Sequence, residues 1–101
     1  MSYQPGIAVP PGRAIAKALD AAGLTQRDLS QRIGISEKHI SQIVNGHAPI
    51  THDTANGLAL VLGGSISFWL NLENNYQETK YRLDSQKRLL DEYPSERQQL
   101  Q

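Results

Sequence analysis

The sequence contains no cysteine, which excludes disulfide cross-links and thiolate metal sites. No apolar stretch approaches the ~20 residues that a membrane-spanning helix needs. The absence of cysteine fits cytoplasmic residence best. The first nine residues lack the basic start and apolar core of a signal peptide. A chain of 101 residues with 39% hydrophobic content predicts one small domain with a modest core.

An excess of positive charge is also missing, because ten Lys and Arg residues face ten Asp and Glu residues. Residues 1–64 carry five cations and four acidic residues, which leaves an excess of only one positive charge. Strong nonspecific DNA binders are usually basic. If the chain binds DNA, we therefore expect moderate affinity that depends on dimerisation.

The segment LTQRDLSQRIGISEKHISQIVNG, which begins at Leu24, predicts two short helices joined by a tight turn. Thr25 is a good N-cap, and Asp28 can reach back to the backbone amides of the first turn. Gly34 ends this helix and Ser36 caps the next one. Two capped helices with so short a connector must cross steeply, which is typical of a helix-turn-helix.

The second helix of this pair has an apolar face, with Ile40, Ile43 and Val44, opposite a polar face. The apolar face would fix the helix to the domain, while amide, hydroxyl and charged groups could reach base edges in the major groove. The alternative is that the polar residues merely solvate a surface helix. The candidates for reading bases are Glu37, Lys38, Ser41 and Gln42.

Two further helices are expected around the pair, one opening near Pro11 and ending at Gly23, the other capped by Thr51 and ending at Gly63. Gly57 would weaken the second of these by ~1 kcal/mol unless a neighbouring element packs against it, and packing is the favoured interpretation. The residues expected to face inward are Ile15, Ala18, Leu19, Ala22, Ala55, Leu58, Ala59 and Leu62.

From Ser67 onward, a seven-residue repeat predicts a long helix that Pro94 should end. Its first part is apolar enough to pack on the domain and to form a two-fold interface, whereas Thr79 and Gln86 weaken the later part as a zipper. The alternative is that Phe68, Trp69 and Tyr76 only complete the monomer core. The dimer or partner candidates are Phe68, Trp69, Leu72, Tyr76, Leu83 and Leu90.

These residues resemble the XRE (Cro/C1-like) helix-turn-helix regulators. The run GHAPITHDTANGLALVLGGSISFWLNLENNY at residues 46–76, together with Pro11-Gly12, resembles the HigA-type antitoxin branch, and the likeness extends over residues 9–81. It implies an all-α, five-helix Cro/C1-type (lambda-repressor-like) DNA-binding domain with an extended C-terminal helix. It also implies a homodimer on operator DNA, and often a cognate toxin partner.

We expect the chain to divide into residues 1–8 as a flexible N-terminal segment, 9–76 as the DNA-binding domain, 77–94 as a helical extension for dimer or partner contact, and 95–101 as a frayed tail. In the family, the position of Gln26 contacts the DNA backbone, and the loop holding Asn45 and His47 often touches phosphate. Asn before Gly also makes a turn without binding anything. The phosphate candidates are Gln26, Arg27, Ser36, His39, Asn45 and His47.

The expected function is a sequence-specific repressor, an antitoxin of a HigBA-type module that represses its own operon as a homodimer on an inverted repeat. One alternative is a phage-type or chromosomal repressor, or the DNA-binding part of a longer regulator. Another is a helical protein-interaction module that does not read DNA, which the zero net charge and Glu37 favour.

An enzyme is not expected. Ser36 with His39 is better explained as a cap followed by a helix-surface histidine than as a nucleophile with its base. His47 and His52 lack the nearby companions of a zinc site. No catalytic residue, metal or cofactor is therefore assigned.

Overall fold

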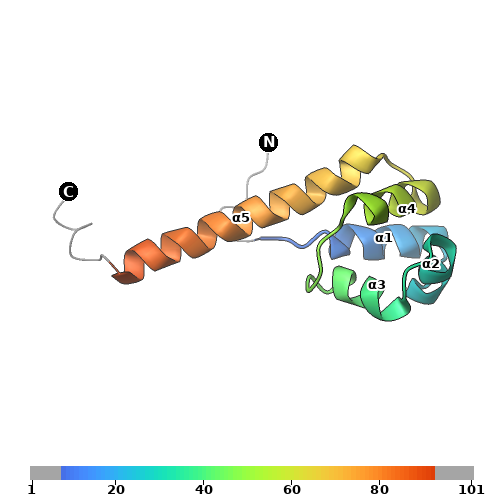
Figure 1. Cartoon of the computed structure of the whole chain (residues 1–101), viewed down its shortest axis with the longest axis horizontal. Coiled ribbons are helices and arrows are strands. Elements are labelled where there is room, and N and C mark those ends of the chain that lie inside the picture. Colours follow the sequence, from blue (N-terminus) through green and yellow to red (C-terminus); the bar gives the residue numbers. More distant parts are fainter. Residues whose placement is uncertain (1–7, 93–101) are drawn as a thin grey trace.

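The computed structural model describes residues 8–92, which form five α-helices and no strand. They are α1 (Gly12–Ala22), α2 (Gln26–Ile33), α3 (Glu37–Val44), α4 (His52–Leu62) and α5 (Ile66–Glu92) (Figure 1). The all-α, five-helix fold with an extended C-terminal helix is confirmed. The expected stop at Pro94 and frayed tail, like most of the expected flexible N-terminal segment, lie outside the described residues.

The four short helices gather at one end of the molecule, and α5 lies along α4 before it continues well past them (Figure 1). Within the short helices, α2 packs against α3 and α4, and α1 packs against the same two. The expected boundary between residues 76 and 77 falls inside α5, which runs unbroken across it.

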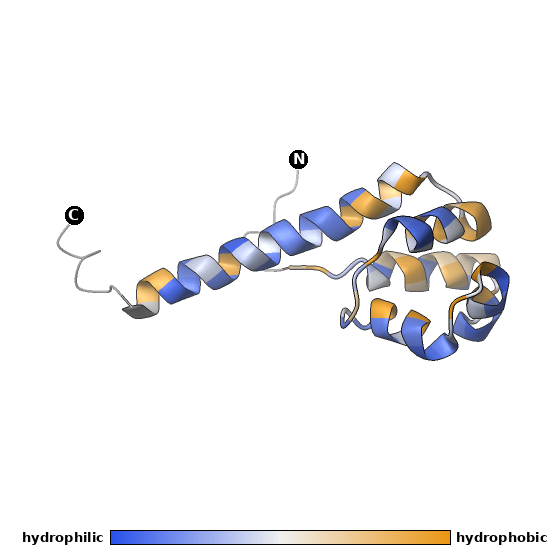
Figure 2. Cartoon of the chain, viewed as in Figure 1, coloured by the Kyte–Doolittle hydropathy of each residue, from blue (hydrophilic) through white to orange (hydrophobic). Residues whose placement is uncertain are grey.

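The core lies between the apolar faces of these helices. In Figure 2 hydrophobic colours concentrate among the short helices, whereas most of the projecting part of α5 is hydrophilic. Every helix contributes to the buried set, as does the loop between α3 and α4. The buried hydrophobic residues are Ile15, Leu19, Leu29, Ile40, Ile43, Ile50, Ala55, Leu58 and Trp69.

Hydroxyl side chains begin three of the short helices, as predicted. The Thr25 hydroxyl accepts the backbone N–H of Asp28 (3.0 Å), and the Asp28 carboxylate accepts the N–H of Thr25 (2.9 Å). This reciprocal pair is a capping box. Ser36 and Thr51 accept backbone N–H groups in the same way at the starts of α3 and α4, so the predicted caps are confirmed.

Two glycines allow helices to approach closely. A Cβ on Gly12 would overlap the backbone carbonyl of Val44, at the end of α3. A Cβ on Gly57 would lie 2.9 Å from the side chain of Ile33, so the packing interpretation of Gly57 is confirmed. The absent side chain of Gly12 therefore lets α1 support α3.

The structure corrects two predictions, the burial of Ala22 and the first residue of the long helix. Ala22 is exposed although it shares a side of α1 with the buried Ile15 and Leu19, because it is the last residue of the helix. The long helix begins at Ile66 rather than Ser67, because the Ser65 hydroxyl accepts the backbone N–H of Phe68 (3.0 Å) and caps the helix earlier.

The two neighbouring aromatic residues of α5 have different environments. Trp69 is only 2% exposed, and its indole N–H donates to the carbonyl of Gly63 (2.9 Å). Phe68 is 47% exposed and meets the Trp69 ring edge to face, with centroids 5.0 Å apart. Trp69 thus belongs to the monomer core, and its inclusion among the surface contact candidates is corrected.

Candidate nucleic-acid interface

The turn between α2 and α3 sets the crossing of these two helices. Gly34 adopts a left-handed backbone (φ 75°), and its N–H donates to the carbonyl of Ser30 (2.9 Å). Ile35 then packs, half buried, against the core. Because the turn is closed by backbone bonds and anchored by an apolar side chain, α3 is held in a fixed direction across α2.

Helix α3 presents a polar surface from a buried base. Ile40 and Ile43 are each only 2% exposed, whereas Glu37, Lys38 and Gln42 are exposed. Ser41 is half buried, and its hydroxyl accepts the side-chain N–H of Asn45 (3.3 Å). Three of the four base-reading candidates therefore face solvent freely, and the fourth is partly engaged within its own helix.

Four of the six phosphate candidates lie at the two ends of the motif. At the start of α2, Arg27 is exposed and Gln26 half buried; just past α3, Asn45 and His47 are exposed. The two ends could meet a DNA backbone on either side of a groove occupied by α3.

The remaining phosphate candidates lie at the start of α3. The Ser36 hydroxyl accepts the backbone N–H of His39 (3.1 Å), and the His39 side chain is half buried. With its hydroxyl in use as a cap, Ser36 can offer a phosphate chiefly the exposed backbone amides of the first turn.

The segment after α3 is a tightly bonded loop. The N–H of Gly46 donates to the carbonyl of Ile43 (3.1 Å), and that of His47 to the carbonyl of Gln42 (2.7 Å). Gly46 has a φ of 81°, a conformation that favours glycine. Asn45 therefore does serve the turn, and its side chain remains exposed beside it.

A buried glutamate on α5 fastens this loop, and sequence reasoning did not single it out. Glu73 is 7% exposed; one carboxylate oxygen accepts the backbone N–H of Ile50 (2.9 Å) and the other accepts the amide of Gln77 (2.7 Å). The available signal was its position one helical turn after Trp69, on the side of α5 that packs against the domain.

Electrostatics at the start of α2 follow from the capping box. The pKa of the Asp28 carboxyl is lowered, chiefly by the hydrogen bond from the Thr25 backbone and then by that from the Thr25 hydroxyl. The ionised form is thereby favoured beside the positive end of the helix dipole.

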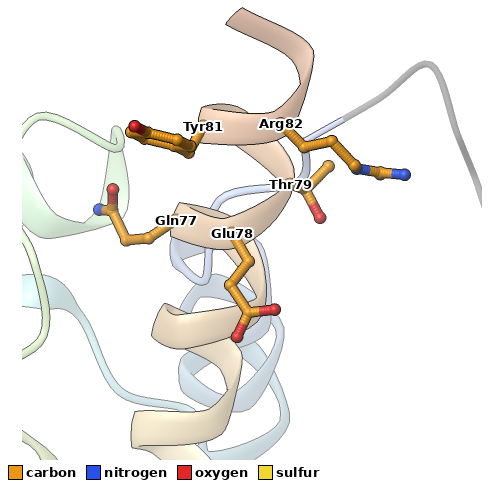
Figure 3. A pocket seen from close by; sticks show the side chains of 5 residues that line it. All are labelled: Gln77, Glu78, Thr79, Tyr81 and Arg82. Atoms are coloured by element: carbon orange, nitrogen blue, oxygen red, sulfur yellow. The ribbon is translucent and has the colours of Figure 1, made fainter. Parts of the chain in front are cut away.

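From residue 77 onward α5 projects past the other helices, and this projecting half of α5 carries polar, charged and apolar side chains. Gln77 and Tyr81 point to one side of the helix, and Thr79 and Arg82 to the other (Figure 3). These residues and Glu78 line a shallow hollow, and within the described part of the chain no second element encloses it. Of the remaining dimer or partner candidates, Leu72, Tyr76 and Leu83 are half buried and Leu90 is exposed.

Residues 8–92 contain no group of three or more His, Asp or Glu side chains placed to hold a metal ion. None of the helices described combines the length and apolarity needed to cross a bilayer.

Comparisons with known proteins agree with this geometry. A family model described as helix-turn-helix matches residues 15–69. The HTH-type transcriptional regulator YddM of Escherichia coli (strain K12) is 33% identical over 64 residues, which cover 63% of this chain and 68% of YddM. Antitoxin HigA-1 of Vibrio cholerae is 32% identical over 69 residues, with 59% of this chain and 65% of that protein covered.

The chain thus spans about two thirds of the length of these two relatives. Among solved structures, an addiction module antidote protein of the HigA family from Coxiella burnetii is similar, with a TM-score of 0.74 and 30% identity. That match covers 84% of this chain and 94% of the other. The chain belongs to the XRE-type helix-turn-helix family, in its HigA antitoxin branch.

Proposed function

We propose that this protein is a sequence-specific DNA-binding repressor whose helix α3 enters the major groove. One observation carries the proposal: a short capped helix with Ile40 and Ile43 buried beneath it presents Glu37, Lys38 and Gln42 to solvent. A helix anchored in this way can bring its polar side chains to base edges without leaving the domain.

Each exposed side chain of α3 has a base partner that suits it. The Gln42 amide can pair with adenine through one donor and one acceptor, and the Lys38 ammonium can donate to guanine. The Glu37 carboxylate can accept the amino group of cytosine. Gln26, Arg27, Asn45 and His47 would hold the flanking phosphates and so set the register of α3.

The repressor acts as a homodimer formed through α5. At 3.6 residues per turn, Phe68, Leu72, Leu83 and Leu90 fall within about 60° of one another around the helix. Phe68 and Leu90 are exposed, so the stripe reaches solvent at both of its ends. Two α3 helices related by such a two-fold axis can read an inverted repeat if they reach successive major grooves, which lie ~34 Å apart.

The biological role that fits is that of an antitoxin which represses its own operon and binds a cognate toxin. The likeness to HigA-1 and to the Coxiella burnetii antidote protein supports this role. We further propose that the chain is not an enzyme and acts in the cytoplasm, where a DNA-binding repressor meets its operator.

Titration of the purified chain against fluorescent DNA from its own promoter region, with scrambled DNA of equal length as control, tests the proposal. We expect selective binding by the native chain. Gln42→Ala should reduce that selectivity, with about 1–3 kcal/mol of discrimination lost. Asn74→Ala also truncates an exposed amide of α5 but on the side away from the stripe that contains Phe68 and Leu90, so it should leave selectivity unaltered.

Equal affinity for both DNAs, from a folded dimer, would contradict the repressor. That result would favour the second candidate function, a protein-interaction module that does not read DNA. The net charge of zero supports this second candidate. Co-purification with the product of the adjacent gene would then identify its partner.

A further inference from the structure

We propose that Lys80, on α5, is an additional contact for the DNA backbone and acts together with the loop that follows α3. This inference rests on the proposed function, because a phosphate contact presupposes DNA binding. The motif itself lies in residues 24–46, whereas Lys80 belongs to the projecting half of α5, which sequence reasoning assigned only to dimer or partner contact.

The first step is that α5 and the loop after α3 form one continuous surface. The buried Glu73 carboxylate accepts the N–H of Ile50 and the amide of Gln77, so both its oxygens are engaged. Moving the loop away would leave a buried carboxylate without these hydrogen bonds, at a large cost in free energy. The loop therefore keeps a fixed position on α5.

The second step is a small cleft between these two elements, with a volume of about 130 Å³. His47 and Pro49 of the loop line one side, and Tyr76 and Lys80 of α5 line the other. His47 is itself a phosphate candidate. The fold thus brings Lys80 of α5 beside the loop that follows α3.

The third step is the position of the Lys80 ammonium. Glu73, Tyr76 and Lys80 follow one another at helical spacing, so they share the side of α5 that faces the domain. The Lys80 Nζ lies 5.7 Å from the centroid of the Tyr76 ring. A cation–π contact of this kind restrains the side chain, and the exposed position of Lys80 lets its ammonium donate to a phosphate.

The fourth step is charge. Residues 24–46 carry three cations, Arg27, Arg32 and Lys38, against two carboxylates, Asp28 and Glu37, an excess of only one. Phosphate contacts supply much of the affinity of DNA-binding proteins. Lys80 would place one further cation next to the loop, where it offsets the buried Glu73 carboxylate that lines the same cleft, in a chain whose overall net charge is zero.

The experiment is an anisotropy titration of the full chain with promoter-region and scrambled DNA at about 50 and about 200 mM salt. Lys80→Gln should weaken binding to both DNAs by the same factor and lower the salt slope by about one unit per protomer. The affinity lost between the two salts should then be about threefold smaller for each contact removed. Lys80→Arg keeps the charge and should keep the slope.

Lys87→Gln is the matched control, since this exposed lysine lies on the same side of α5, about 10 Å further from the loop. We expect it to leave the slope unchanged, and far-UV circular dichroism should show all variants folded. Selective binding by the native chain, with an unchanged slope for Lys80→Gln, would overturn the Lys80 contact and leave the repressor intact. An equal loss of slope for Lys87→Gln would overturn it as well, in favour of diffuse attraction. No DNA binding by the native chain would overturn both proposals.

Discussion

The two halves of α5 are built from one unbroken helix and yet have opposite surroundings. Before residue 77, Trp69 lies in the core and Glu73 is buried against the α3–α4 loop. Beyond it, Tyr81 is 73% exposed and Leu90 is 52% exposed. The first half of α5 stabilises the DNA-binding domain, whereas the second half, within residues 8–92, adds mostly exposed surface.

The two halves of α5 therefore differ in role: the first half stabilises the domain that presents α3, and the second half offers surface for association with another molecule. The exposed face of α3 is supported by Ile40 and Ile43 in the common core, and the first half of α5 supplies that core with Trp69. The projecting half makes no comparable contribution. Changes in the two halves should therefore affect different measurements, which the following experiments can establish.

The largest expected effect is that of Trp69→Ala. It removes a buried indole and its hydrogen bond to Gly63, so the free energy of unfolding should fall by about 3–5 kcal/mol. Leu90→Ala, in the exposed half, should change the unfolding free energy of the monomer by less than about 0.5 kcal/mol. Urea denaturation followed by far-UV circular dichroism measures both.

Leu90→Ala should instead weaken self-association, which sedimentation velocity over a range of concentrations would detect. Similar losses of stability from the two changes would show that the projecting half of α5 is part of the cooperative fold. The contrast drawn between the two halves would then be wrong.

Gly12→Ala should have the next largest effect, because its Cβ would overlap the backbone carbonyl of Val44. Overpacking against rigid backbone should cost about 3 kcal/mol and displace the end of α3. Gly23→Ala provides the control: its φ is 70°, but no heavy atom lies within 4 Å of the added Cβ. That change should cost about 1 kcal/mol through backbone strain alone.

Chemical denaturation of both alanine variants, with DNA titration of Gly12→Ala, makes this comparison. A cost for Gly12→Ala no larger than that for Gly23→Ala would argue against close support of α3 by α1.

The smallest expected effect is the pH dependence of the Asp28 capping box. Because the pKa of this carboxyl is lowered in the folded chain, its contribution to stability is present above the ordinary value of 3.8 and is lost as the pH falls through the lowered value. The melting temperature of the native chain should exceed that of Asp28→Asn at neutral pH, and the difference should shrink in acid. A difference that stays constant down to about pH 2 would show that the carboxylate is not responsible.

Local signals in the sequence predicted most of the fold. Thr25, Ser36 and Thr51 were recognised as caps, since an N-cap hydroxyl acts on the amides two or three residues ahead. Gly34 was recognised as a stop because glycine enters the left-handed region cheaply. The polar and apolar faces of α3 follow from a spacing that is visible in the sequence.

The features that escaped prediction depend on contacts between distant residues. Nothing local distinguishes Trp69 from Phe68, because neighbours on a helix point about 100° apart and the rotation of α5 on the domain decides which is buried. Glu73 looks like a surface glutamate until Ile50 is placed beside it. Gly12 reads only as part of a helix start, and its role depends on Val44 in another helix.

The unbroken course of α5 also has a mechanical consequence. With 27 residues, the helix is about 40 Å long and stiff along most of that length. Trp69 and Glu73 fix the first turns of α5 to the domain, so the helix can act as a lever that pivots beside the loop after α3. A small tilt imposed at the far end would be transmitted to the spacing of two recognition helices in a dimer. A partner that grips the projecting half could thus alter operator binding without touching DNA.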